Sequence, residues 1–161
     1  MFDVGQNMKK TLMILGGIFA VLILAGVVGF SILAVKGKAL DKESKAYVDE
    51  VTPIILANLN QETLFQYASD ELKNSAPQED FDKLFKWFDK LGKFIDYKES
   101  VGQANFSVTT QNGKQITGYY EAHAEFENGL ATIKITTIKK GENWQIYGFR
   151  INSMALVNEA T

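Results

Sequence analysis

The feature that most constrains this chain is an uncharged apolar run near its N-terminus. Thr11 to Val35 comprises 25 residues without a charged side chain. A helix of that length, at 1.5 Å per residue, is about 37 Å long, whereas the hydrocarbon core of a bilayer is about 30 Å thick. The run therefore predicts one transmembrane helix over 11–35, preceded by a short tail over 1–10.

A cleaved export signal is the competing interpretation of this run, because Lys9 and Lys10 precede the apolar residues. Signal peptides have apolar regions of about 7 to 15 residues that end in a small-x-small cleavage site. The run here is longer, and it ends in Ala34, Val35 and Lys36 without such a site. We therefore expect an anchor that stays attached.

The orientation of the anchor follows from the charges that flank it. Lys9 and Lys10 before the run are matched by Lys36 and Lys38 after it, so the positive-inside bias nearly cancels. A short tail ahead of a first anchor favours an N-terminus in the cytoplasm. The predicted location is the inner (plasma) membrane, with the C-terminal domain periplasmic or extracellular.

Small residues four apart within the run would let a second helix approach closely. Chance spacing in an apolar stretch is the alternative. The two pairs are Gly16 with Ala20, and Ala25 with Gly29.

The chain after the anchor has the size of one domain, predicted as a linker over 36–40, a soluble fold over 41–155 and a tail over 156–161. From Lys36 onward it carries 15 Lys and Arg and 18 Asp and Glu, with the signs interleaved. Nucleic acid is excluded as a partner, because it requires clustered positive charge. The absence of cysteine excludes disulfides, a thiolate nucleophile and a cysteine-ligated metal.

Helical periodicity dominates the first part of this domain, and a period of two dominates the rest. Short connections with Asn-Gly turns predict that the strands form an antiparallel meander. The predicted helices run over 41–59, with a kink or restart at Pro53, from the N-cap Asn60 to near Asn74, and from Pro77 to the C-cap Gly92. About four strands follow, over 94–108, 116–127, 130–138 and 144–152. The first of these is either one strand broken at Gly102 or two short ones.

A bulge at Gly148 is predicted in the last strand, because it would bring four large apolar side chains to the core side and bend the sheet. These side chains are Trp144, Ile146, Phe149 and Ile151.

The order of these elements resembles the cone-shaped superfamily named after nuclear transport factor two. The helix restart at Pro77, the aromatic third helix ending in Leu91-Gly92-Lys93-Phe94, and the run Gly141 to Ile146 look like its small bacterial members of unassigned function. The resemblance covers Asp41 to about Ser153. It implies an α+β fold with three helices packed on a strongly bent antiparallel sheet of about four strands.

The resemblance also implies a place to look for chemistry, since superfamily enzymes use Asp, His and Tyr inside the cone. The only histidine, His123, shares one strand face with Glu121 and Glu125, and it could bind a metal or act as a general base. Metal sites usually need three or four good ligands. An exposed histidine on a solvated face is therefore the favoured interpretation, and we expect neither metal nor cofactor.

Other candidates lie on the first strand and on the helices. Asp96 and Tyr97 could supply a cone-mouth acid or hydrogen-bond donor, and Tyr47, Tyr67 and Trp87 could line a pocket with Tyr97. Aromatic residues at helical spacing are more often core residues, which is the alternative. No phosphate-binding glycine loop, nucleophile elbow or paired-acid spacing is present.

The function that we expect is a non-enzymatic accessory or scaffold subunit of a membrane protein complex. The bilayer and other membrane proteins are its predicted partners. Domains of similar fold on one N-terminal helix occur in secretion machines and lipid-import complexes, as the resemblance implies. A membrane-tethered ligand-binding module or enzyme that uses the cone interior is the alternative, and a fibre or pilus subunit is a third.

Overall fold

The computed structural model of the chain describes residues 37–109 and 113–157. Two compact units divide the chain, Met1–Lys38 and Ala39–Thr161. Within the described ranges, no helix is both long enough and apolar enough to cross a membrane. The predicted anchor over 11–35 lies outside those ranges, and so do its four small residues Gly16, Ala20, Ala25 and Gly29.

The first described helix covers residues 37–57 and is called helix 37–57 here. It includes residues 37–40 of the predicted linker, which are helical. It also continues through Pro53 without a restart, although proline in a helix interior costs about 3 kcal/mol. Burial explains this, because Val51 and Ile55, on either side of the proline, are 3% and 0% exposed in the core.

The second predicted helix is split in two: α2 covers Gln61–Tyr67 and α3 covers Asp70–Lys73. Between them Ala68 forms a parallel bridge with Ile146, and the Ser69 N–H donates to the Ile146 carbonyl at 2.8 Å. The Ser69 hydroxyl then accepts from the Leu72 N–H and begins α3. The break arises because this segment pairs with a strand far away in the sequence.

Asn60 is the N-cap of α2, as predicted, and its Oδ1 accepts from the Thr63 N–H at 2.8 Å. Asn60→Ala leaves that N–H without its partner and is expected to lower the free energy of unfolding by about 1 kcal/mol. Urea denaturation of the full chain in detergent measures the loss. Asn58→Ala, an exposed change just ahead of the cap, should change it by less than about 0.5 kcal/mol. Equal losses in the two variants would contradict the capping role.

The third helix, α4, covers Gln78–Phe88, with Pro77 as its N-cap residue. The short 3-10 helix η1 (Asp89–Leu91) extends it, and Gly92 closes the segment at a φ of 72°. That left-handed conformation suits glycine, and the predicted C-cap is confirmed.

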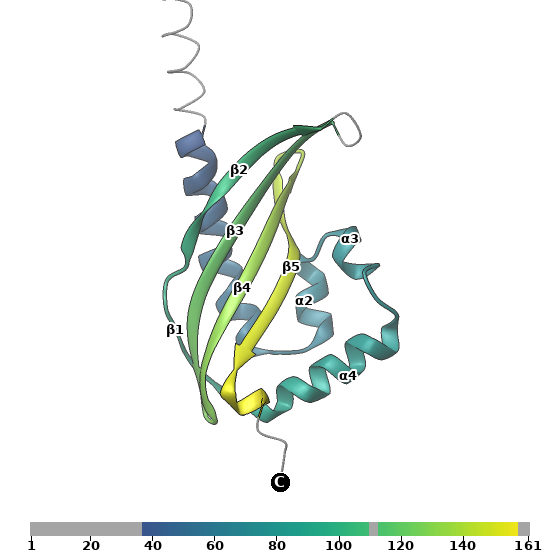
Figure 1. Ribbon diagram of the computed structural model, residues 1–161, viewed down its shortest axis with the longest axis vertical. Helices are drawn as coiled ribbons and strands as arrows, with labels where there is room; N and C mark the ends of the chain where they lie inside the picture. The colour runs from purple at the N-terminus through teal and green to yellow at the C-terminus, as the bar shows by residue number, and fades with distance from the viewer. Residues whose placement is uncertain (1–36, 110–112, 158–161) are drawn as a thin grey trace, which may run out of the picture. The chain divides into compact units, whose positions relative to one another are not determined.

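The sheet has five strands where about four were predicted, and all its strand pairs are antiparallel. β2 and β1 pair with successive parts of β3, along the same edge (Figure 1). The chain leaves the sheet over 98–100 and not at Gly102. The strands are β1 (Phe94–Tyr97), β2 (Val101–Thr109), β3 (Gly113–Phe126), β4 (Gly129–Lys140) and β5 (Asn143–Ser153), with β1-β3-β4-β5 as the spatial order.

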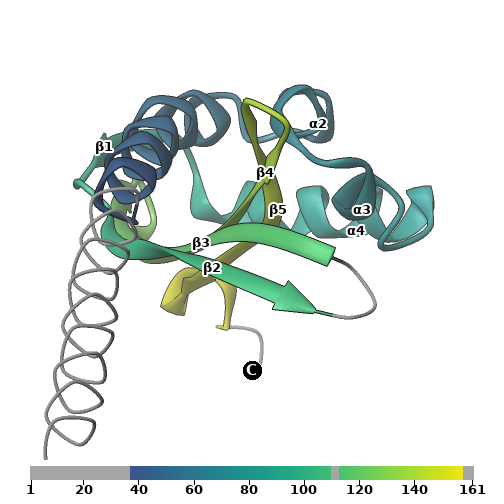
Figure 2. The ribbon, with the colours of Figure 1, turned by 90° about the horizontal axis from the view of Figure 1, so that it is seen from above.

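The helices line one face of this curved sheet, as Figure 2 shows, and the core lies between them. The predicted alternation along β3 is confirmed: Tyr120 and Ala122 are buried, whereas Tyr119 and His123 are exposed on the opposite face, which we call the outer face. A second 3-10 helix, η2 (Met154–Leu156), buries Leu156 and carries the fold just past the predicted boundary at 155.

The predicted bulge in β5 is present. Thr136 pairs with Gly148 and Thr137 pairs with Ile146, so Tyr147 is the extra residue. The side-chain alternation is thereby reset, as predicted. Trp144 is buried, and the core includes Ile146, Phe149 and Ile151.

Candidate functional site

A polar cluster around Asp49 links helix 37–57 to the junction between β1 and β2. Asp49 Oδ1 accepts from the Tyr97 hydroxyl at 2.9 Å and from the Ser100 N–H at 2.9 Å. Asp49 Oδ2 accepts from Lys45 Nζ at 2.7 Å, and Lys45 also forms an ion pair with Glu99. Both carboxylate oxygens are therefore engaged.

A second aspartate of the same helix binds the sheet in the same way. Asp41 Oδ1 accepts from the Ala104 N–H at 2.7 Å, eight residues ahead of Asp49 along the helix. β2 has a strand neighbour on one side only, so backbone N–H groups on its other side need partners. Asp41 binds one of them, and Asp49 binds the Ser100 N–H just ahead of the strand.

The electrostatics of the cluster fix its protonation states. Burial alone would raise the pKa of Asp49, but hydrogen bonds from Lys45, Ser100 and Tyr97 outweigh it and lower that pKa. Burial, together with the hydrogen bond to Asp49, raises the pKa of Tyr97 well above its ordinary value. At neutral pH Asp49 is thus an anion and Tyr97 a neutral phenol. A general base needs a pKa near the working pH, and the lowered pKa of Asp49 makes it a weak one.

The other predicted pocket residues do not form one group. The Tyr47 hydroxyl donates to the Tyr67 carbonyl at 3.3 Å, and burial raises the pKa of Tyr47 to about 12. Asp96, which is not part of the Asp49 cluster, forms an ion pair with Lys98, whose hydrogen bond lowers the pKa of Asp96. Trp87 lies on α4 with 40% of its surface exposed. The structure thus joins Tyr97 to Asp49 and Tyr47 to Tyr67, and leaves Trp87 on the surface.

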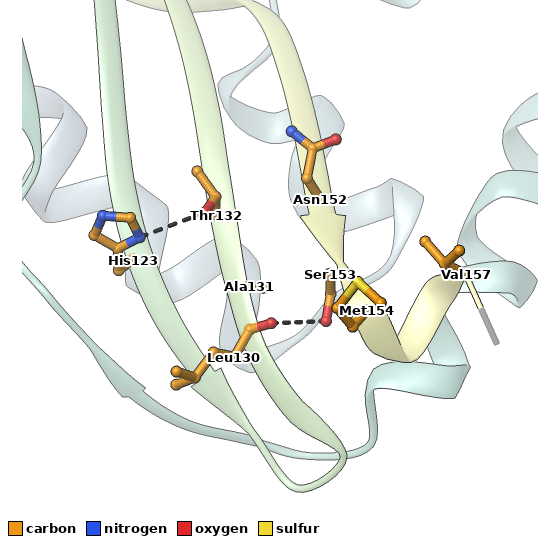
Figure 3. A pocket seen from close by; sticks show the side chains of 8 residues that line it. All are labelled: His123, Leu130, Ala131, Thr132, Asn152, Ser153, Met154 and Val157. Carbon is orange, nitrogen blue, oxygen red and sulfur yellow. Dashed lines mark hydrogen bonds between the residues drawn. The ribbon is translucent and has the colours of Figure 1, made fainter.

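His123 lies exposed on the outer face, beside a shallow depression at the end of the sheet (Figure 3). The Thr132 hydroxyl, on the neighbouring strand, is 3.4 Å from His123 Nδ1. Among the described residues, no three His, Asp or Glu side chains come together as a metal site requires. The depression has a volume of about 470 Å³ and is lined by His123, Leu130, Ala131, Thr132, Asn152, Ser153, Met154 and Val157.

A second depression of about 430 Å³ lies between α4 and β5, and it shares Asn152 with the first. It contains Trp87 and also Arg150, the only arginine of the chain. We call it the α4–β5 groove. Its lining residues are Leu84, Trp87, Phe88, Phe149, Arg150, Ile151 and Asn152.

Sequence reasoning missed both the Asp49 cluster and the α4–β5 groove. The i,i+4 spacing of Lys45 and Asp49 was the only local signal for the first. For the second, the signals were Trp87, which is off the apolar stripe of α4, and the presence of a single arginine.

No protein-family model, curated protein or solved structure matches the chain. The resemblance to the cone-shaped superfamily therefore stays a prediction, and function has to be argued from these surfaces.

Proposed function

We propose that this protein is a non-enzymatic accessory or scaffold subunit of a membrane protein complex. In this proposal residues 11–35 anchor it in the inner (plasma) membrane, and the domain lies on the periplasmic or extracellular side and contacts partner proteins. One observation carries it: three of the four most exposed large apolar side chains of the described residues lie around the first of two adjoining depressions, whereas the polar groups best suited to chemistry, Asp49 and Tyr97, bind each other.

The exposure of these apolar side chains supports a contact surface. Leu130, Met154 and Val157 around the first depression are 74%, 70% and 67% exposed, and Trp87 in the α4–β5 groove is 40% exposed. A scattered exposed Leu is ordinary, but apolar groups that gather around a hollow are typical of interaction sites.

The position of this surface suits a subunit that is tethered at one end. The start of helix 37–57 lies beside the β4–β5 hairpin, where Lys139 Nζ is 2.8 Å from Glu43 Oε2. The two depressions lie toward the other end of the strands, near the β3–β4 hairpin and η2 (Figure 1). The described chain therefore begins at the end of the domain away from the two depressions.

Purification of the full-length chain from native membranes in mild detergent tests the proposal. We expect other membrane proteins to co-purify at fixed stoichiometry. Recovery of a partner-free monomer at native abundance would contradict it. Replacing both Gly16 and Ala20 with leucine tests the contribution of the anchor. If partner helices pack against that pair, the bulkier side chains would lower the recovery of partners. Leucine in place of Val21 and Val27 is the matched control.

A ligand-binding module that uses the interior between helix 37–57 and the sheet is the second candidate. It is favoured by three buried hydroxyls, those of Thr52, Ser100 and Tyr120, which complete no hydrogen bond within the described part of the chain. Each has polar neighbours: Ser44 is beside Tyr120, and the Tyr97 hydroxyl is beside the other two. A small apolar ligand with one polar group is the chemistry that such an interior would take.

A screen of such molecules by thermal shift should then give a hit that Tyr120→Phe weakens, and the lack of any hit would remove the candidate.

A further inference from the structure

The free edge of β5 has unused hydrogen-bonding capacity. β5 is the last strand of the spatial order, so one of its sides has no neighbouring strand. The segment between α2 and α3 covers that side only at Ile146, where Ala68 forms the bridge and Ser69 donates its N–H. Within the described residues no other strand pairs with β5 from Tyr147 to Ser153 on that side. An uncovered strand edge is a template for an added strand.

The opposite edge of the sheet provides the contrast. Asp41 of helix 37–57 binds the backbone N–H of Ala104 in β2, and Asp49 of the same helix binds that of Ser100, just ahead of β2. The uncovered stretch of β5 borders the α4–β5 groove.

Arg150 supplies the charge at this edge. Its side chain is exposed, and the guanidinium group has no ion pair or hydrogen bond within the described part of the chain. Its cross-strand partner on β4 is Lys134, which has the same charge and lies 3.7 Å from Glu121. Two like charges opposite each other destabilise a sheet, and one carboxylate offsets only one of them. The outer face at this point therefore has one positive charge in excess, which complements a carboxylate.

We propose that an extended segment of a partner protein adds to the sheet as a sixth strand along β5. This inference rests on the proposed function and names the partner chemistry. The segment contributes an apolar side chain to the α4–β5 groove, against Trp87 and Phe149. Successive residues of a strand point to opposite faces, so its adjacent residue lies on the outer face and presents a carboxylate to Arg150. The expected motif is an apolar residue next to an acidic one.

A second copy of this chain fits the edge less well. Antiparallel pairing of two β5 strands about a two-fold axis near residue 150 would bring the two Arg150 side chains together, beside the two Lys134 side chains. An acidic partner segment has no such repulsion.

Photo-crosslinking in native membranes tests the inference. A benzophenone amino acid replaces Asn152 in the full-length chain, at the point where the two depressions meet, and the crosslinked peptide is sequenced by mass spectrometry. We expect a peptide of another protein with adjacent apolar and acidic residues. Arg150→Glu and Trp87→Ala should each reduce its yield roughly tenfold or more. Lys42→Glu, an exposed charge reversal on helix 37–57, should leave the yield unchanged.

The remaining outcomes overturn the inference. A crosslink to residues 158–161 would assign the groove to the chain's own end, and a crosslink to β5 of a second copy would assign it to self-association. If the crosslink persists in both Arg150→Glu and Trp87→Ala, and both variants unfold thermally like wild type, neither side chain contributes to binding the segment. If partners still co-purify in any of these cases, the proposed function stands. If none co-purify with the wild-type chain, the proposed function itself fails.

Discussion

Gly102→Ala is expected to lower the free energy of unfolding by about 3 kcal/mol, a large effect for the addition of one methyl group. A Cβ at this position would lie 2.0 Å from the Tyr119 carbonyl oxygen and 2.6 Å from Tyr120 Cδ1. The nearer atom belongs to the backbone of β3, so no change of side-chain rotamer relieves the contact. β2 would have to move away from β3, and the Tyr120 ring, which is buried in the core, would have to move with it.

Equilibrium urea denaturation of the full chain in detergent, followed by tryptophan fluorescence, measures this loss. Gly148→Ala is the matched control on β5. Its Cβ would meet the Thr136 side chain at 3.4 Å, which is ordinary contact, and the expected loss is below about 1 kcal/mol. Equal losses at Gly102 and Gly148 would mean that β2 does not approach β3 this closely.

Gly102 also illustrates what the sequence could and could not predict about the fold. Periodicity predicted the third helix, the buried face of β3 and the bulge beside Gly148, because each follows from local spacing. Gly102 was predicted to mark a break, since glycine weakens a strand. The structure instead places the glycine inside β2, where it allows a close approach to Tyr120.

The breaks that the sequence missed are set by contacts between distant residues. The chain leaves the sheet between β1 and β2 where the Ser100 N–H binds Asp49, 51 residues away. The helix predicted from Asn60 to Asn74 is interrupted where Ala68 reaches β5. Local propensity contains no information about either partner. Helix 37–57 continues through Pro53 for the same reason, since its buried face is set by the sheet.

For the candidate sites too, the sequence predicted what depends on local spacing and missed what depends on distant contacts. Strand alternation correctly predicted that His123 is exposed. The predicted pocket grouped Trp87 with three tyrosines by residue type alone, but α4 presents Trp87 to the α4–β5 groove. An aspartate on a helix gives no sign of its function until the segment opposite it is known, which is why Asp49 was missed.

Asp49→Asn is expected to lower the free energy of unfolding by about 2 kcal/mol at pH 7. The change replaces Oδ2, which accepts from Lys45, with an NH2 donor. It also removes the negative charge that strengthens the bonds from Tyr97 and the Ser100 N–H to Oδ1. The expected loss is smaller than that for breaking a fully buried ion pair, because the Asp49 side chain keeps 27% of its exposure. Glu50→Gln removes the same charge from the exposed side of the helix and should change stability by less than about 0.5 kcal/mol.

The pH dependence identifies the charge of Asp49 as the cause. Burial opposes ionisation, but the hydrogen bonds to Asp49 hold its pKa below the value of the unfolded chain, about 3.9. The stabilisation is thus fully present above that unfolded value and is lost as the pH falls through the lower, folded pKa. Wild type and Asp49→Asn should therefore differ by a constant amount from about pH 5 to 7, and the difference should narrow below about pH 4. A difference that stays constant down to pH 2 would show that Asp49 acts through its shape and not through its charge.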